Sequence, residues 1–381
     1  MKIAEIKGIK IKIHYSTLLI LLMVGISSAT FYQQASSAEL GWIELTSFGV
    51  VNGILLLFSI VIHEVMHSLI AQKHGQEIEE IELYLFGGQA KIKDEVHNPT
   101  DEMKMAAAGP AASIVFGGLL LLLLYIPWNL NLFMAATFNY IGFANLILAG
   151  FNLVPAFPMD GGRILRGYLW KKRGDIVSAT KTASKAGKGF AYFLYGLGVI
   201  EIFLFGSLGG FWSIIIGNFI KNAAEQSYQQ TVYMETLAKM KVRDLVGQIS
   251  WAIPADTRVI DAIRNYFMPY KHTYFPVKKE DEVIGVLHAH TVQNIPPHER
   301  GVKEVQDVMI PLEKIPSVDS SMDAKAAFLE IAQGDSEEGL LAVYNKEHEF
   351  IDFLDSSDFR TALYFNNEIS KMNKAGVKPG I

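Results

Sequence analysis

The chain has 381 residues, of which 50% are apolar and only 19% are charged, with no cysteine and a formal net charge of −5. The lack of cysteine excludes disulfides and thiolate metal sites, and the modest negative charge gives no reason to expect nucleic-acid binding. The apolar residues are concentrated in the first 220 positions. We therefore expect a membrane domain followed by a water-soluble one.

The first part of the chain predicts about six membrane spans. The alternation over Ile9–Ile13 is typical of a short strand or an amphipathic lead-in, and no cleavage motif follows the first apolar run, which indicates a retained span. The expected spans are 16–31, 47–72, two within the charge-free stretch 105–159 that are divided at 127–131, 190–205 and 208–220. The last stretch is short enough for a re-entrant hairpin. Two short strands are expected within 77–94, turning at Gly87 and Gly88.

The charges between the spans predict the orientation. Lys and Arg occur before the first span and after the second, fourth and sixth, and they are absent from the other loops. The positive-inside rule therefore places both termini in the cytoplasm. This pattern predicts a multi-pass protein of the cell membrane.

The second span contains the motif His63-Glu64-Val65-Met66-His67. On a helix, His63 and His67 share one face, where two imidazoles can bind a tetrahedral zinc ion. The adjacent Glu64 can accept a proton from an attacking water. Residues 46–62 carry no charge, and charged groups at the end of such a run are costly in lipid unless they serve a function. The motif predicts a zinc hydrolase site inside the membrane, close to its cytoplasmic side.

Two histidines leave zinc short of a third protein ligand, and three residues are candidates. Asp160 ends the charge-free stretch at a depth similar to the histidines, on a segment that Pro155 and Pro158 prevent from being helical. Glu201 in the fifth span is more typical of a side chain that bonds to a neighbouring helix or reaches the interface. His14 is more typical of a residue that caps the first span. We therefore expect Asp160 to be the ligand.

Taken together, these motifs resemble those of the site-2 protease family of intramembrane zinc metalloproteases. The resemblance covers residues 5–225 and rests on the histidine motif, on the Asn-x-x-Pro…Asp-Gly signature in 152–162, and on Ala108-Gly109-Pro110. It implies regulated intramembrane proteolysis, in which a peptide bond of a single-span membrane protein is hydrolysed. The site residues it implies are the zinc ligands His63, His67 and Asp160, the base Glu64, and Asn152 as a contact to the substrate or the oxyanion. It also implies that the strands of 77–94 pair with an unwound substrate.

The rest of the chain contains an internal repeat. Val242-Arg243-Asp244-Leu245-Val246 recurs as Val305-Gln306-Asp307-Val308-Met309, and each copy continues as strand, helix, strand, turn, strand, helix. This resembles a tandem pair of CBS domains over 241–365. Such a pair implies regulation by an adenine nucleotide and a homodimer formed through the CBS domains.

Two positions of the repeat decide how many nucleotides we expect. The ribose-binding aspartate of the family is kept as Asp358 in the second copy and is Thr291 in the first. The family's glycine is kept as Gly285 in the first copy and is Asp352 in the second. We therefore expect at most one nucleotide per pair, bound at Asp358.

The predicted fold is thus a polytopic α-helical membrane domain with its zinc site in the membrane, followed by an α+β tandem CBS pair. The expected boundaries are the protease domain at 1–225, a linker helix at 226–240, CBS domains at 241–300 and 301–365, and a disordered tail at 366–381. A CBS-gated ion or metal transporter would explain the spans and the CBS pair, but not Glu64 between the histidines. A non-catalytic membrane receptor would be expected to have lost Glu64. We therefore predict a zinc metalloendopeptidase.

Overall fold

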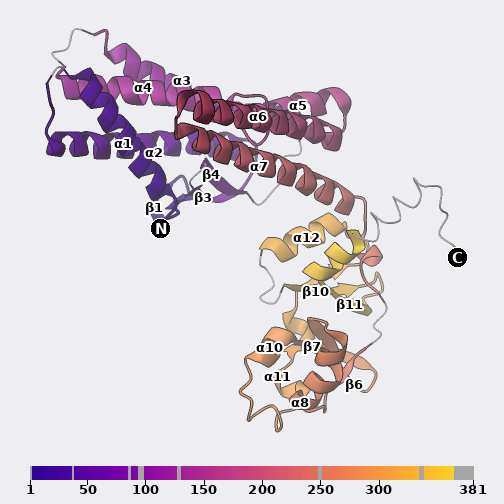
Figure 1. Ribbon diagram of the computed structural model, residues 1–381. Coiled ribbons are helices and arrows are strands. Elements are labelled where there is room, and N and C mark those ends of the chain that lie inside the picture. Colours follow the sequence, from indigo (N-terminus) through magenta and orange to yellow (C-terminus); the bar gives the residue numbers. More distant parts are fainter. Residues whose placement is uncertain are drawn as a thin grey trace. The chain divides into compact units, whose positions relative to one another are not determined.

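The chain folds as two compact units, Met1–Thr231 and Val232–Ile381 (Figure 1). The computed structural model describes residues 2–36, 38–84, 87–92, 98–126, 130–247, 251–333 and 339–363. The expected tail at 366–381 and part of the expected loop at 127–131 lie outside these residues. Each unit is described by itself.

The first unit is built from long helices. Its helices are α1 (Thr17–Ala35), α2 (Trp42–Lys73), α3 (Pro99–Leu123), α4 (Leu132–Asn152), α5 (Asp160–Arg173), α6 (Ile176–Phe205) and α7 (Gly209–Leu237). Among the described residues, α1, α2, α3, α4 and α6 are long and apolar enough to cross a membrane, and they overlap the first five expected spans. The fifth helix, α6, begins at Ile176, well before the expected start at residue 190. The sixth expected span is the first part of α7, which continues without a break into the polar connector. The predicted helical membrane domain is confirmed.

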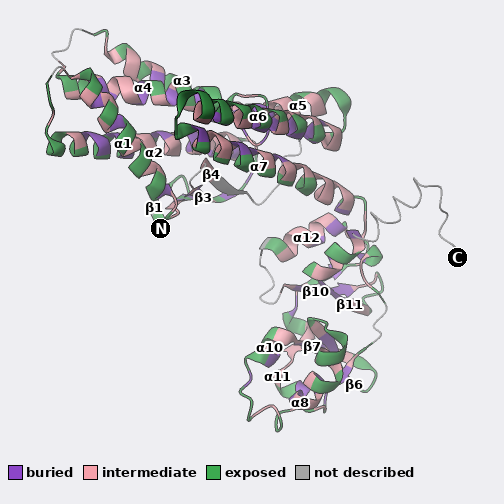
Figure 2. Cartoon of the chain, in the orientation of Figure 1, coloured by how far each residue is buried: buried purple, intermediate pink, exposed green. Residues whose placement is uncertain are grey.

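The outer faces of these helices are apolar. Leu18, Leu22 and Ile26 on α1 are exposed, as are Phe203 and Leu204 on α6 (Figure 2). Exposed apolar faces on helices of this length suit contact with lipid tails, so the burial pattern is that of a membrane protein.

A four-stranded sheet lies beside the helices in the order β1 (Lys2–Ile6), β2 (Ile9–Ile13), β3 (Ile78–Tyr84) and β4 (Gly87–Ile92). The strands β2 and β3 are parallel, with Ile11 opposite Ile81, and the other pairs are antiparallel. Both side chains are buried in one cluster with Val65 of α2. The sheet therefore contains the strands expected at 9–13 and within 77–94. It also leaves β4 as an edge strand that begins next to the zinc motif.

The second unit repeats one α+β pattern. Its elements are η1 (Val242–Asp244), β5 (Ile253–Pro254), α8 (Val259–Ala262), η2 (Ile263–Phe267), α9 (Met268–Tyr270), β6 (Tyr274–Lys279), β7 (Glu282–His288), α10 (Ala289–Gln293), α11 (Val305–Val308), β8 (Ile310–Pro311), η3 (Leu312–Lys314), β9 (Ser317–Asp319), α12 (Ala324–Gln333), β10 (Leu340–Tyr344) and β11 (Phe350–Asp355), and 356–363 is helical. One sheet has the order β5-β6-β7-β8 and the other β11-β10-β9. This is the predicted element order of a tandem CBS pair.

The repeated aspartates cap the turn that opens each copy. Asp244 Oδ2 accepts the N–H of Lys241 at 2.8 Å, and Asp307 Oδ2 accepts the N–H of Glu304 at 3.1 Å. A carboxylate at this position satisfies a backbone donor that the turn leaves unpaired. The motif that revealed the repeat therefore has a local structural cause.

Candidate active site

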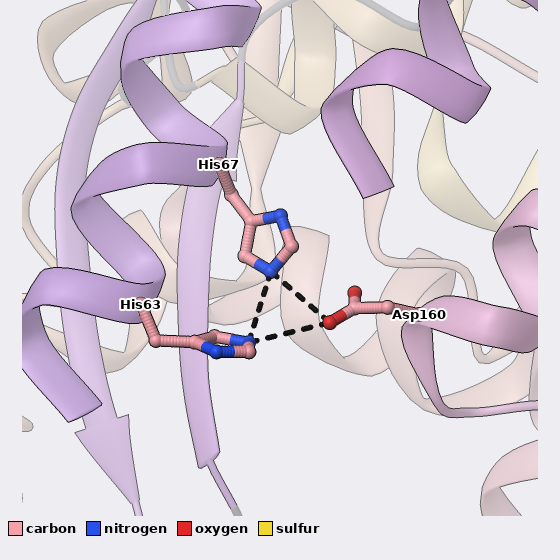
Figure 3. Close-up of side chains that lie close together, drawn as sticks. All are labelled: His63, His67 and Asp160. Carbon is pink, nitrogen blue, oxygen red and sulfur yellow. Dashed lines mark hydrogen bonds and ion pairs between the residues drawn. The ribbon is translucent and has the colours of Figure 1, made fainter. Parts of the chain in front are cut away.

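Three predicted ligand atoms meet at one point of the first unit. His63 and His67 project from one face of α2, and Asp160 is the first residue of α5 (Figure 3). The two Nε2 atoms are 3.1 Å apart, and Asp160 Oδ2 lies 3.3 Å from His63 Nε2 and 3.1 Å from His67 Nε2. All three side chains are largely buried. Residues far apart in the sequence thus form a compact donor set.

This donor set fits a zinc ion. His67 Nδ1 donates to the carbonyl of Met105 at 2.7 Å, so the neutral ring carries its lone pair on Nε2. That lone pair faces the Asp160 carboxylate, an arrangement that needs a cation between them. Tetrahedral coordination with bonds of roughly 2.0–2.1 Å places ligand atoms about 3.3 Å apart, close to the spacing seen here. Among the described residues, this is the one group of acidic and histidine side chains close enough together to hold a metal ion.

The helix α3 holds both imidazoles in this orientation. Ser113 Oγ lies 2.9 Å from His63 Nδ1, and the Met105 carbonyl binds His67. Gly109 packs against the site so closely that a Cβ there would lie 2.6 Å from His63 Nε2. The sequence reasoning missed Ser113 and Met105. Ser113 follows Gly109 by one helical turn, which could have revealed it, whereas a backbone carbonyl has no sequence signal.

The predicted base is held by the edge strand. Glu64 Oε1 accepts the N–H of Gly88 at 3.1 Å. A Cβ at Gly88 would lie 2.6 Å from Glu64 Cδ, so a larger residue there would displace the Glu64 side chain from this position. Gly87 and Gly88 were expected to form the turn between the two strands, but both lie in β4, where Gly88 pairs with Leu83 of β3.

A cavity of about 590 Å³ surrounds these residues. It is lined by His63, Glu64 and His67 of α2, Gly87 and Gly88 of β4, Leu148, Phe151 and Asn152 of α4, Asp160 and Arg163 of α5, and Ile216, Phe219 and Ile220 of α7, among others. Asn152 Nδ2 donates to the Leu148 carbonyl at 3.0 Å. The cavity lining is mostly apolar with a few polar groups, and this is typical of ligand-binding sites.

The two alternative ligands lie outside this group. Glu201 Oε2 accepts the hydroxyl of Ser213 on α7 at 3.1 Å. The ring of His14 accepts the N–H of Ser16 at 3.3 Å, at the start of α1. As expected, Glu201 bonds to a neighbouring helix, and His14 lies at the start of the first span.

In the second unit, Asp358 lies in a carboxylate cluster. Its Oδ2 accepts the N–H of Asp355 at 2.8 Å. Burial raises the pKa of Asp358 to about 7 and that of Asp352 to about 6. Hydrogen bonds from Ser357 and Thr273 lower the pKa of Asp355 against the effect of its burial.

The sheet topology explains why one copy keeps the glycine. Gly285 of β7 pairs with Pro311 of β8, and a Cβ there would clash with the backbone carbonyl oxygen of Ile310. In the second copy, β11 is the last strand of its sheet in the described part of the chain, so no described strand takes the place of β8 beside Asp352. The departure at Asp352 thus has a packing cause that is independent of any ligand.

The helical fold and the three-ligand site together define a membrane zinc metalloprotease. Residues 52–134 and 128–196 match the model of Peptidase family M50. The Mycobacterium tuberculosis protein Rip3, which carries a zinc metalloprotease name, is 30% identical over 323 residues, covering 83% of this chain and 81% of Rip3. The chain therefore belongs to peptidase family M50, and the predicted zinc metalloprotease activity is confirmed.

Solved structures are similar to each part of the chain. The site-2 protease from Methanocaldococcus jannaschii is 32% identical and matches 60% of this chain and 94% of that one, with a TM-score of 0.41. The CBS domain of a bacterial CNNM/CorC family Mg²⁺ transporter is 17% identical and matches 41% of this chain and 95% of that one, with a TM-score of 0.31.

Proposed function

We propose that this protein hydrolyses a peptide bond of a single-span membrane protein inside or next to the lipid bilayer. In this proposal His63, His67 and Asp160 hold one zinc ion, and Glu64 is the general base. The observation that carries it is the meeting of the three ligand atoms, next to Glu64, in one cavity between apolar helices. A bound zinc ion would supply Lewis-acid chemistry to the scissile carbonyl.

The chain's own residues perform the proton transfers. Glu64 accepts a proton from the attacking water and passes it to the leaving nitrogen, which ends the cleavage step with both products neutral at the cut bond. The N–H of Gly88 donates to the Glu64 carboxylate and so orients it. Asn152 lines the same cavity, where its side-chain amide can donate to the substrate carbonyl. The strand β4 is the last strand of the described sheet, and its outer edge offers backbone groups with which an unwound substrate can pair.

The proposed orientation has both termini in the cytoplasm. It is supported by the basic residues before α1, after α2 and in the last turn of α5, where Lys171, Lys172 and Arg173 are exposed. The zinc motif then lies close to the cytoplasmic side, from which water can reach it. The membrane of the cell is the proposed location.

The proposal is tested by purifying the full chain, measuring its zinc, and following cleavage of single-span test proteins. Glu64→Gln should retain zinc because all three ligands remain, while cleavage should fall by about 10²–10⁴-fold. Glu44→Gln is the matched control, because Glu44 is in the first turn of the same helix. Normal cleavage by Glu64→Gln would remove the assigned base.

The same measurements test the third ligand. Asp160→Ala should lower zinc content and cleavage together, whereas Glu201→Gln should leave zinc content unchanged. Full zinc content in Asp160→Ala would point to a different ligand and contradict the proposed site.

For the second unit we propose regulation by one adenine nucleotide per CBS pair, bound at Asp358. The half-buried Asp358 carboxyl and the loss of the equivalent group at Thr291 support single-site binding. A nucleotide alters the cleavage rate only if it binds two arrangements of the pair with different affinity. Zinc content should not change, because the donor set lies entirely in the first unit.

Calorimetry on residues 241–365 with AMP, ADP and ATP tests this binding. We expect heat from at least one of them with a stoichiometry of one per chain, abolished by Asp358→Ala and kept by the exposed control Asp281→Ala. No heat with any nucleotide would leave the pair as a docking or dimerisation module, and the proposed homodimer would then be tested by measuring the mass in solution.

A further inference from the structure

A buried ion pair connects the helix that orients the histidines to the helix that carries Asp160. Arg166 Nε on α5 donates to Glu102 Oε1 on α3 at 2.6 Å, and Nη2 contacts the same oxygen. Glu102 is fully buried and Arg166 is mostly buried. We infer that this pair holds Asp160 in place, so that Glu102 and Arg166 are positioning residues of the metal centre. The inference rests on the proposed zinc site.

One stripe of α3 serves the whole donor set. It consists of Glu102, Met105, Gly109 and Ser113, whose spacing places them on one face of the helix. The Met105 carbonyl bonds to His67, and the Ser113 hydroxyl bonds to His63. The remaining ligand, Asp160, begins α5, the helix that carries Arg166. The same helix face therefore contacts two ligands directly and is joined by the ion pair to the helix that carries the third.

Contacts of Arg166 and of the next residue hold the segments before and after Asp160 in place. The guanidinium carbon of Arg166 lies 5.0 Å from the centre of the Phe157 ring, three residues before Asp160. The next residue, Gly167, packs so closely on α3 that a Cβ would lie 2.8 Å from the Pro99 carbonyl oxygen. Ligands have to be held within about 0.5 Å of their productive positions. A shift of α5 along α3 by more than this distance would move the Asp160 carboxylate away from the imidazoles.

The burial of the pair makes it sensitive to the loss of either partner. Glu102 Oε2 is buried without a hydrogen-bond partner in the described part of the chain, so Arg166 is the principal group that compensates this carboxylate. Removing one member of a buried pair leaves an uncompensated charge, whereas removing both members does not. A displacement of α5 is therefore expected from each single substitution and less from the double one.

The experiment uses the full chain in detergent with Glu102→Gln, Arg166→Met and the double variant. The zinc dissociation constant is measured by competition with a chelator, and Co²⁺-loaded protein gives a visible spectrum that reports on the ligand geometry. Each single substitution should raise the dissociation constant about 10–100-fold and alter the Co²⁺ spectrum. In the double variant, the fold-increase of the dissociation constant should be smaller than the product of the two single fold-increases, because no charge remains unpaired.

Two further variants keep the test decisive. Arg173→Met is the control, because Arg173 lies at the other end of α5 and donates to Thr182 on α6 at 2.9 Å, and it should bind zinc like the wild type. Arg166→Lys keeps the charge without the two-nitrogen contact, so it should fold and show an intermediate affinity.

Different outcomes test the positioning role of the ion pair and the proposed zinc site separately. Single variants with a lower melting temperature but wild-type zinc affinity and Co²⁺ spectrum would overturn the positioning role and leave a structural one. An equal loss of affinity in Arg173→Met would overturn it as well. A wild-type protein that binds no zinc would instead contradict the proposed metal site itself.

Discussion

At the scale of single residues, hydrogen bonds turn both imidazoles toward Asp160. Ser113 and the Met105 carbonyl bind the Nδ1 atoms, so both Nε2 atoms point at the same carboxylate oxygen. Partners of this kind fix the tautomer and raise the basicity of a metal-binding histidine. The orientation of the two histidines is therefore set by hydrogen bonds from α3.

The close packing of Gly109 against this donor set gives a first prediction. Gly109→Ala should lower zinc content by about ten-fold or more, because the new Cβ would lie 2.6 Å from His63 Nε2 and displace the ring. Metal analysis of the purified protein measures this. Gly118→Ala is the control on the same helix, since its Cβ would meet no atom within 4 Å. Full zinc content in Gly109→Ala would contradict the proposed ligand geometry.

At the scale of elements, the helices of the first unit approach one another at glycines. A Cβ at Gly117 of α3 would lie 2.7 Å from the Gly142 carbonyl oxygen of α4. Asn145 on α4 then donates to Ser59 Oγ on α2 at 3.0 Å. Small residues and interhelical hydrogen bonds are the main sources of helix association in a membrane, where burial of apolar surface contributes little. These contacts set the distance between α2 and the segment that leads to Asp160.

The crossing of α3 and α4 gives a second prediction. Gly117→Ala should destabilise the membrane unit by about 1–3 kcal/mol, because its Cβ would press on backbone atoms that cannot rotate away. The neighbouring Gly118→Ala should be neutral or stabilise the helix by up to about 1 kcal/mol, since alanine favours the helix without any clash. Thermal unfolding in detergent compares the two. Equal melting temperatures would show that the crossing has room for a methyl group.

At the scale of the whole molecule, each unit has cores of its own. The second unit contains three hydrophobic clusters made from its own residues, including Phe359, Phe275 and Phe353. It also contains the carboxylates of Asp352 and Asp358, whose pKa values burial raises to about 6 and about 7. The stability of this unit should therefore respond to pH independently of the zinc chemistry.

The direction of that response follows from the two raised pKa values. Between pH 4 and 7 the folded unit binds more protons than the unfolded chain, so its stability should fall as the pH rises. The pKa of Asp355 is lowered, so the stability that Asp355 contributes is lost only when the pH falls below 3.8, the ordinary pKa of an aspartate. The two pKa values are raised from 3.8 by about 5 units in total, which corresponds to an upper bound of roughly 7 kcal/mol. Because both carboxyls are partly exposed, solvent screening reduces this, and we expect a loss of a few kcal/mol.

Urea unfolding of residues 232–381 at pH 4.5, 5.5 and 7 measures this loss. Asp352→Asn should flatten the part of the slope below pH 6, because the amide needs no proton. The exposed Asp281→Asn is the control and should leave the slope unchanged. A stability that rises between pH 4.5 and 7 would contradict the assigned pKa directions.

Much of the fold could be predicted because its signals are local. The long apolar stretches place α1 to α4 and the second half of α6, and the alternation over Ile9–Ile13 places β2. The repeat at Asp244 and Asp307 locates the start of each copy of the repeat, because each aspartate caps its own turn. The extent of α7 is less predictable, since one continuous helix joins an apolar half to a polar one.

The sequence by itself determined that His63 and His67 share a helix face with Glu64 beside them, because the helical repeat alone requires it. It also indicated Asp160, through the end of a charge-free stretch. Only the tertiary structure decided what surrounds them: Ser113 on His63, the N–H of Gly88 on Glu64, and Arg166 on Glu102. These contacts join elements far apart in the chain, and one of them uses a backbone group that every residue has. No local period encodes such partners, because they depend on how the helices and the edge strand pack.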